Sequence, residues 1–135
     1  MIRATLNKRK PDELGSGEFG ASRGLRKHNG IDYTCEPRTR ILSPVRGKVT
    51  KIGYPYADDF GYRYVQITDN DNRYHRVFYI EPGVSLGDVV TRDTIIGEAQ
   101  DIAIRYASVG RMNNHVHYEI MTIKDGKKVY HDPEA

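Results

Sequence analysis

The stretch NHVHYEI, residues 114–120, organises the rest of the chain. In it, β-branched or aromatic residues alternate with His115, His117 and Glu119. A period of two predicts a β-strand with one apolar and one polar face. Side chains at i and i+2 share a face, so the two imidazoles project together from Cα atoms roughly 7 Å apart. Such a pair is typical of two metal ligands, or of a ligand beside a catalytic base. The alternative is a polar strand face that carries two histidines by chance.

The size and charge of the chain suit a single domain with a core of its own. It has 135 residues, and its 21 Lys and Arg against 18 Asp and Glu give a formal net charge of +3. This small excess suits an anionic partner such as a cell-wall polymer or a nucleic acid, and the charge alone does not choose between them. No nucleic-acid-binding motif accompanies it, so we expect no nucleic-acid partner. Residues 1–17 are polar and end in Gly-Ser-Gly, which predicts a flexible N-terminal arm before a domain of residues 18–135.

The cysteine content and the distribution of apolar residues bear on the expected location of the protein. Cys35 is the only cysteine, which excludes an intrachain disulfide and a cysteine cluster for zinc. No segment approaches the ~18 apolar residues of a membrane span, and the N-terminus lacks the apolar run of a signal peptide. We therefore expect synthesis in a host cytoplasm, with action elsewhere only after release or as part of a virion. The sequence does not indicate an oligomeric state.

Turn residues divide the chain into short strands, and no stretch has a sustained 3.6-residue apolar period. Residues 62–68 and 74–80 are expected to form a hairpin, and Asp125-Gly126 to close another one near the C-terminus. Residues 100–112 form a long loop of a kind that is often functional. The remaining strands are expected at 27–33, 41–45, 47–53, 84–90 and 94–97, with a tight turn joining 41–45 to 47–53. The predicted fold is all-β and mostly antiparallel.

Two clusters carry donors suited to a divalent metal. His28 and Asp32 lie four residues apart with a glycine between them, and His115 and His117 follow much later. Catalytic zinc takes three protein ligands and leaves a fourth position for water. His28, Asp32 and one histidine of the later pair supply that set, and the other histidine can act as a general base. The absence of soft ligands argues against copper(I) and iron–sulfur centres.

Four segments make a resemblance specific. In chain order they are FGASRGLRKHNGID (19–32), SPVRGKV (43–49), VSLGDVVTRDTIIG (84–97) and NNHVHYEI (113–120). They resemble the lysostaphin/LytM-type zinc endopeptidases, which cut peptidoglycan cross-bridges, and the ending DGKKVYHDPEA resembles that family's closing hairpin. The resemblance implies a compact β-sandwich-like fold with a groove above one sheet. It also implies that His28, Asp32 and His117 bind Zn²⁺ and that His115 is a catalytic histidine.

The sequence departs from that family at one strand. Active members usually carry another catalytic histidine in a Tyr-x-His-Leu segment, whereas this chain reads RVFYIEP at 76–82. That segment resembles a chemotaxin-like branch of the same fold, which keeps the metal site and is not known for peptidase activity. Tyr79 stands at the histidine's position, and its phenol can donate a hydrogen bond to an oxyanion. Glu81, expected on the same strand face, is the alternative as a carboxylate base.

Five further residues have side chains that could take part in the predicted metal site. His75, on the expected face of Tyr79 but roughly 13 Å along the strand, is interpreted as a surface histidine, as is His131. Arg23 either contacts a substrate anion or is an ordinary surface arginine. Cys35 is expected to be buried rather than a ligand. Glu119 either orients a histidine ligand or is a structural charge.

The leading hypothesis is a zinc-dependent endopeptidase that hydrolyses the peptide cross-links of bacterial peptidoglycan. A signal-less, single-domain wall hydrolase suits a bacteriophage product. The alternative is a zinc-containing, catalytically inactive binding or structural module of the same fold. The two hypotheses differ in what Tyr79 does.

Overall fold

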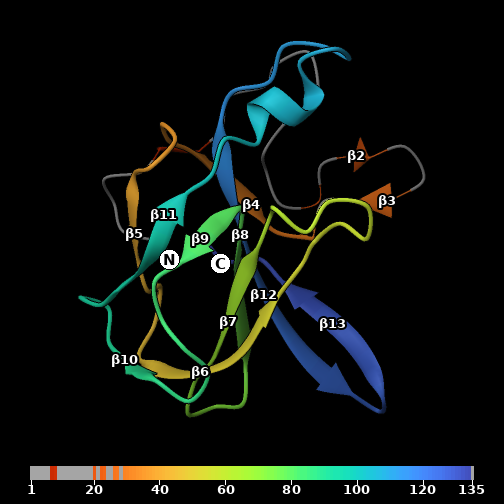
Figure 1. Cartoon of the computed structure of the whole chain (residues 1–135). Coiled ribbons are helices and arrows are strands. Elements are labelled where there is room, and N and C mark those ends of the chain that lie inside the picture. Colours follow the sequence, from red (N-terminus) through yellow and green to blue (C-terminus); the bar gives the residue numbers. More distant parts are fainter. Residues whose placement is uncertain (1–6, 9–19, 21, 24–25, 28, 135) are drawn as a thin grey trace.

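The fold is built from antiparallel β-sheets (Figure 1). The computed structural model describes residues 7–8, 20, 22–23, 26–27 and 29–134. Within these residues the only helical element is a short 3₁₀ turn, η1 (Ala103–Tyr106). The prediction of an all-β, mostly antiparallel fold is confirmed. No described helix is long and apolar enough to cross a lipid bilayer.

The largest sheet has eight strands and contains the predicted His-x-His strand as β12. Its order is β1 (Asn7–Lys8), β4 (Ile31–Thr34), β12 (His115–Lys124), β8 (Tyr74–Phe78), β7 (Tyr64–Thr68), β6 (Gly47–Gly53) and β10 (Val89–Val90), with β13 (Lys127–His131) also paired to β12. A second sheet has the order β5 (Arg40–Leu42), β11 (Ile95–Ala99) and β9 (Ile80–Pro82). A small ribbon pairs β2 (Ser22–Arg23) with β3 (Arg26–Lys27).

The apolar core contains side chains from both larger sheets. The three-stranded sheet contributes buried residues such as Ile41, Ile80 and Ile96, and the eight-stranded sheet contributes others such as Val65 and Tyr118. β-branched residues dominate the cluster, as expected for a pleated surface packed on one side. Burying such a side chain contributes about 1.5–3 kcal/mol. The opposite face of the large sheet is therefore left for polar residues.

Strand β12 is long enough to take different neighbours along one edge. Its first part pairs with β4 through His115–Tyr118, and its last part pairs with β13 through Ile120–Lys124. The turn to β13 contains Asp125 and Gly126 at φ 52° and 76°. Positive φ at both central residues is the geometry that Asp-Gly hairpin turns favour. This hairpin and the hairpin of β7 and β8 confirm two sequence predictions.

Two other strand predictions are wrong in part. Residues 41–45 are a strand only through Leu42, and the segment that follows leads from the three-stranded sheet of β5 to the eight-stranded sheet of β6. Residues 84–90 form a strand only at β10, since the preceding residues make a turn in which Asp88 Oδ2 accepts a hydrogen bond from the Ser85 amide at 2.8 Å. Of residues 1–17, Asn7–Lys8 form β1 against β4, and the rest lie outside the described residues.

Candidate functional site

The polar face of the large sheet brings two predicted metal ligands together. The register pairs His117 of β12 with Asp32 of β4 on one side and with Phe78 of β8 on the other. Directly opposed residues of neighbouring strands share a face, so these side chains lie in one row. Asp32 and His117 are 2% and 9% exposed. Strand alternation thus carries Asp32, His115, His117 and Glu119 to one side and Tyr118 to the core.

His117 lies between two carboxylates. Its Nδ1 is 3.0 Å from Asp32 Oδ1, and its Nε2 is 2.9 Å from Glu119 Oε1. Burial lowers the pKa of this imidazole, but the hydrogen bonds and charges of the two carboxylates outweigh burial and raise the pKa to about 9. The two carboxylates beside His117 therefore favour a positive charge at this position. A divalent cation bound at Nδ1 and Asp32 would supply that charge, and Nε2 would keep its hydrogen and donate it to Glu119.

A polar row behind the site supports Glu119. Arg76 Nη1 lies 3.7 Å from Glu119 Oε2, and Arg76 Nε donates to Gln66 Oε1 at 2.8 Å. Gln66 Nε2 in turn donates to Thr50 Oγ1 at 3.0 Å. These residues lie on β12, β8, β7 and β6, so the row crosses four adjacent strands. It fixes the carboxylate that orients His117, which favours the interpretation of Glu119 as an orienting residue.

His115 has a ring orientation that suits a base. Its Nδ1 is 2.8 Å from the carbonyl oxygen of Asn113, and its Nε2 is 3.5 Å from Asp32 Oδ2. Because a carbonyl can only accept a hydrogen bond, Nδ1 carries the hydrogen. The neutral imidazole then has its lone pair on Nε2, on the side of Asp32. His115 is 4% exposed, so its orientation is held by packing as well.

Gly30 explains why a glycine stands between the first two predicted ligands. A Cβ at this position would overlap the carbonyl oxygen of Tyr118 and lie 2.9 Å from Cε1 of His117. Only glycine therefore lets the segment before β4 pass this close to β12. His28 itself lies outside the described residues, as does the side chain of Arg23.

Tyr79 lies in a break between two strands, and its side chain faces the site. It follows β8 and precedes β9, with φ 70°, which is uncommon for a residue other than glycine. Plain alternation would place it on the core face with Val77, which is fully buried. Instead its ring packs edge-on against His115 with centroids 5.6 Å apart. Burial raises the pKa of Tyr79 from about 10 to about 12, which moves its titration still further from neutral pH.

The break at Tyr79 also separates it from the two residues expected on its face. Glu81 lies exposed on β9, opposite Glu98 of β11, in the three-stranded sheet. It lines a surface cavity of about 550 Å³ with Arg38, Tyr62 and other residues. The shared strand face predicted for Glu81 and Tyr79 is therefore wrong, since the strand is not continuous. Whether Glu81 acts as a base stays a prediction.

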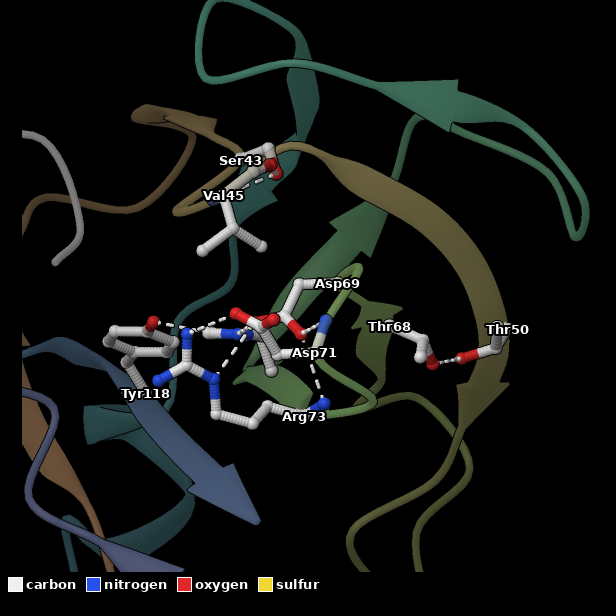
Figure 2. A network of polar contacts seen from close by, with 9 residues as sticks. Ser43, Val45, Thr50, Thr68, Asp69, Asp71, Arg73 and Tyr118 are labelled. Atoms are coloured by element: carbon white, nitrogen blue, oxygen red, sulfur yellow. Dashed lines mark hydrogen bonds and ion pairs between the residues drawn. The ribbon is translucent and has the colours of Figure 1, made fainter. Parts of the chain in front are cut away.

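His75 is buried on the core face, so its interpretation as a surface histidine is wrong. It is 2% exposed, with Nδ1 at 2.7 Å from the Tyr118 hydroxyl and Nε2 at 2.7 Å from Asp69 Oδ2. Figure 2 shows Tyr118 converging with Asp69 and Arg73 of the β7–β8 turn. Asp69 also accepts hydrogen bonds from the amides of Asp71 and Arg73, so it is an acceptor and His75 Nε2 is the donor. Cys35 is buried and His131 exposed, as expected.

Asn114 is a site-supporting residue that the sequence patterns do not reveal. Its Oδ1 accepts hydrogen bonds from the amides of Ile102 and Ala103 at 2.8 and 3.2 Å. Its Nδ2 donates to the carbonyls of Cys35 and Gln100 at 3.0 and 3.1 Å. One side chain thereby joins the end of β4, the start of β12 and the loop before η1. An asparagine directly before His-x-His is the only signal that could have indicated this role.

The described residues alone do not complete a metal centre. They contain no group of three or more His, Cys, Asp or Glu side chains able to hold a metal ion. The third predicted ligand, His28, is not among them. The donors that are described fit a divalent cation, because an imidazole nitrogen and a carboxylate oxygen converge beside a second imidazole. Tyr79 lies next to this group, and Glu81 and His75 do not join it.

Comparisons with known proteins give a family for the chain. The model of peptidase family M23 matches residues 26–133. No protein among the curated sequences matches the chain.

Several solved structures have a similar fold. A point mutant of the catalytic domain of the prophage-encoded M23 protein EnpA from Enterococcus faecalis is 21% identical, with a TM-score of 0.67 over 100% of this chain and 94% of that one. The catalytic domain of lysostaphin from Staphylococcus simulans is 20% identical, with a TM-score of 0.62 over 86% of each chain. A zinc-containing peptidase from Vibrio cholerae is 22% identical, with a TM-score of 0.65 over 96% of this chain and 37% of that one. These similarities establish a shared fold.

Proposed function

The chain belongs to peptidase family M23, and from this membership we propose that it is a zinc-dependent endopeptidase that hydrolyses peptide cross-links of bacterial peptidoglycan. The observation that carries the proposal is the convergence of Asp32 and His117, 3.0 Å apart, beside the Nε2 atom of His115. We assign the metal ligands to His28, Asp32 and His117. The Glu119 carboxylate at Nε2 of His117 supports this set, because ligating histidines commonly donate their other ring hydrogen to a carboxylate.

The zinc ion, when bound, supplies a Lewis acid that polarises the peptide carbonyl and lowers the pKa of water. His115 then acts as the general base, since its Nδ1 hydrogen is held by the Asn113 carbonyl and its lone pair lies on Nε2. It accepts a proton from the attacking water and delivers that proton to the leaving amine. The peptide C–N bond breaks, and one carboxyl group and one amine are released.

Tyr79 is assigned the role of hydrogen-bond donor to the oxyanion that develops on the peptide carbonyl. Its hydroxyl is protonated at neutral pH, all the more because burial raises its pKa, and its ring lies against His115. Losing one donor of this kind typically costs about 10²–10³-fold in kcat. Tyrosine donates without titrating near pH 7, unlike the histidine that active relatives usually carry at this position.

A second candidate function follows from the same residue. If tyrosine cannot replace the usual histidine, the protein is a zinc-containing binding or structural module without catalysis. The site of action is part of the proposal too: peptidoglycan is reached after release from the cell that makes the protein, or as part of a virion. The prophage-encoded EnpA protein, which has the same fold, supports a bacteriophage origin.

One experiment separates the two functions. Zinc-loaded wild type and His115→Ala are incubated with purified sacculi of several peptidoglycan types, and released amines are counted. We expect release by wild type and a loss of about 10²–10⁴-fold for His115→Ala, with zinc content unchanged. His131→Ala is the matched control, because His131 is exposed on β13. No release by wild type from any of these substrates would reject the peptidase and favour the binding module.

A further inference from the structure

The ring of Tyr79 is enclosed by aromatic side chains from separate parts of the chain. Tyr56 is nearly parallel to it, with centroids 6.2 Å apart and an interplanar angle of 12°. Tyr62 stands perpendicular at 6.5 Å, and Phe78 is tilted at 6.1 Å. His115 completes the enclosure at 5.6 Å. Aromatic pairs with these separations stabilise each other beyond the burial of their area.

This enclosure matters because the backbone of Tyr79 is in a sparsely populated conformation. Its φ of 70° persists only where surrounding contacts determine it. The backbone is held by hydrogen bonds from the Tyr79 amide to the Arg63 carbonyl and from the Gln100 amide to the Tyr79 carbonyl, each 2.8 Å long. The direction of the side chain depends on the rings around it and on a polar contact of its hydroxyl with that of Tyr56.

Tyr56 is the ring among these with the most elaborate support. Its hydroxyl lies 2.8 Å from the hydroxyl of Tyr106, and the Arg105 guanidinium lies 3.7 Å from the centre of its ring. Arg105 is in turn paired with Asp58 at 3.1 Å and Asp59 at 3.4 Å. Both neighbours of Tyr56 belong to η1, and both carboxylates belong to the loop that carries Tyr56. The ring is therefore held between two segments.

Further bonds join those two segments, residues 54–63 and residues 100–106. The Gln100 side chain donates to the Gly61 carbonyl at 2.6 Å and accepts from the Arg63 amide at 3.0 Å. The Tyr62 hydroxyl donates to the Asp101 carbonyl at 2.6 Å. These hydrogen bonds join two loops that are far apart in sequence into one unit, which packs around the Tyr79 ring. Packing against the Tyr79 ring would not by itself require the hydrogen bond between the hydroxyls of Tyr56 and Tyr106.

We propose that Tyr56 is a positioning residue, which, fixed by Tyr106 and Arg105, holds the Tyr79 ring against His115. The inference rests on the proposed function, in which the Tyr79 hydroxyl contacts the reacting carbonyl. Tyr56 acts only through Tyr79 and touches no reacting atom. A displacement of about 1 Å at such a donor can cost up to 10²-fold in rate.

A double-mutant cycle tests whether Tyr56 acts through Tyr79. Tyr56→Leu removes the parallel ring, and Tyr56→Phe keeps the ring but removes the hydroxyl that contacts Tyr106 and Tyr79. Turnover of soluble cross-linked muropeptides should fall roughly 10–100-fold in kcat for Tyr56→Leu, with KM nearly unchanged, and less for Tyr56→Phe. In a Tyr79→Phe background the same changes should add little. Equal losses in both backgrounds would overturn the proposal.

A readout without activity keeps the test independent of the proposed function. 3-Fluorotyrosine at position 79 should give a single sharp ¹⁹F signal, which broadens or shifts in Tyr56→Leu and Tyr56→Phe. Tyr54→Leu is the matched control, because Tyr54 is 49% exposed on the same loop and packs on Phe60 and Arg63 rather than on Tyr79. A signal that Tyr56 variants leave unchanged would reject the positioning role, whether or not wild type cleaves peptidoglycan.

Discussion

Two buried histidines on opposite faces of the large sheet are used in different ways. His117 on the site face lies between Asp32 and Glu119, whereas His75 on the core face lies between Asp69 and the Tyr118 hydroxyl. Burial lowers the pKa of both imidazoles. At His117 the two carboxylates reverse this effect and raise the pKa to about 9, whereas at His75 burial outweighs Asp69 and the pKa stays below its ordinary value.

The number of carboxylates and their other partners account for the difference. Asp69 is also bonded to Arg73 Nε at 3.2 Å and to two backbone amides, so much of its charge is already compensated. His75 can then stay neutral and simply link the β7–β8 turn to Tyr118. His117 faces two carboxylates at once, and its site favours a cation. Burial and hydrogen bonding are common to both histidines, and the local negative charge at His117 is what favours its proposed role as a metal ligand.

The largest expected effect is on zinc content. His117→Ala removes a predicted ligand and should abolish the zinc that wild type binds at about one ion per chain, as should His28→Ala. His75→Ala should keep its zinc, because His75 faces the core. Elemental analysis of the purified proteins measures this directly. Full zinc retention in His117→Ala would show that His117 is not a ligand and would remove the contrast with His75.

The second effect is on stability and concerns the core face. His75→Ala leaves a cavity and deprives the buried Tyr118 hydroxyl of its partner, so the free energy of unfolding should fall by about 2–4 kcal/mol. Urea denaturation of the zinc-loaded protein measures it. The control is His131→Ala, which removes an exposed histidine bonded to Thr122 and should change stability by less than about 0.5 kcal/mol. Equal changes in the two variants would show that the His75 network contributes nothing specific.

Gly30→Ala should affect the site face with a smaller cost. The added methyl group would overlap the Tyr118 carbonyl and press on the His117 ring, which costs about 1–3 kcal/mol of stability and weakens zinc binding. Competition with a chelating dye measures the zinc affinity. Gly83→Ala is a suitable control, because a Cβ there meets no atom closer than 3.6 Å. Unchanged affinity in Gly30→Ala would mean that the segment before β4 moves without disturbing His117.

The smallest effect is a pH dependence that depends on His75. Because the folded state holds the pKa of His75 below its unfolded value of about 6.5, protons bind the unfolded chain more readily below that pH. The free energy of unfolding should therefore fall as pH decreases from about 6.5, and less steeply in His75→Gln. Asp69, whose pKa is also lowered, loses its contribution at still lower pH. An identical slope in wild type and His75→Gln between about pH 5 and 7 would contradict this.

The sequence patterns predicted the strands that carry strict alternation and clear turn signals. The His-x-His strand and the Asp-Gly turn at Asp125 are of this kind, and both depend only on local backbone preferences. The partner sheet of β5 could not be predicted, because it depends on non-local pairing with β11. For the same reason Asn114, whose bonds reach back to Cys35, gave little signal in the sequence.

Site prediction failed where the backbone departs from regular geometry. Extending a period of two through Tyr79 placed His75, Tyr79 and Glu81 on one face. The positive φ at Tyr79 ends that period, so the three side chains point to three different environments. The burial of His75 depends on Asp69 and Tyr118, which lie 6 and 43 residues away in the chain. Neither neighbour follows from the residues next to His75.

The lengths of the outer strands have a consequence for self-association. A sheet edge with unpaired N–H and C=O groups is a template on which a second chain can add a strand. Two of the outer strands, β1 and β10, have two residues each in the part of the chain that the structure describes. The longer outer strand, β13, pairs within the described residues with β12 alone and begins with Lys127 and Lys128. Short edges and repelling lysines make this sheet a poor seed for amyloid-like stacking, although nearly all of the regular structure in the described residues is β-strand.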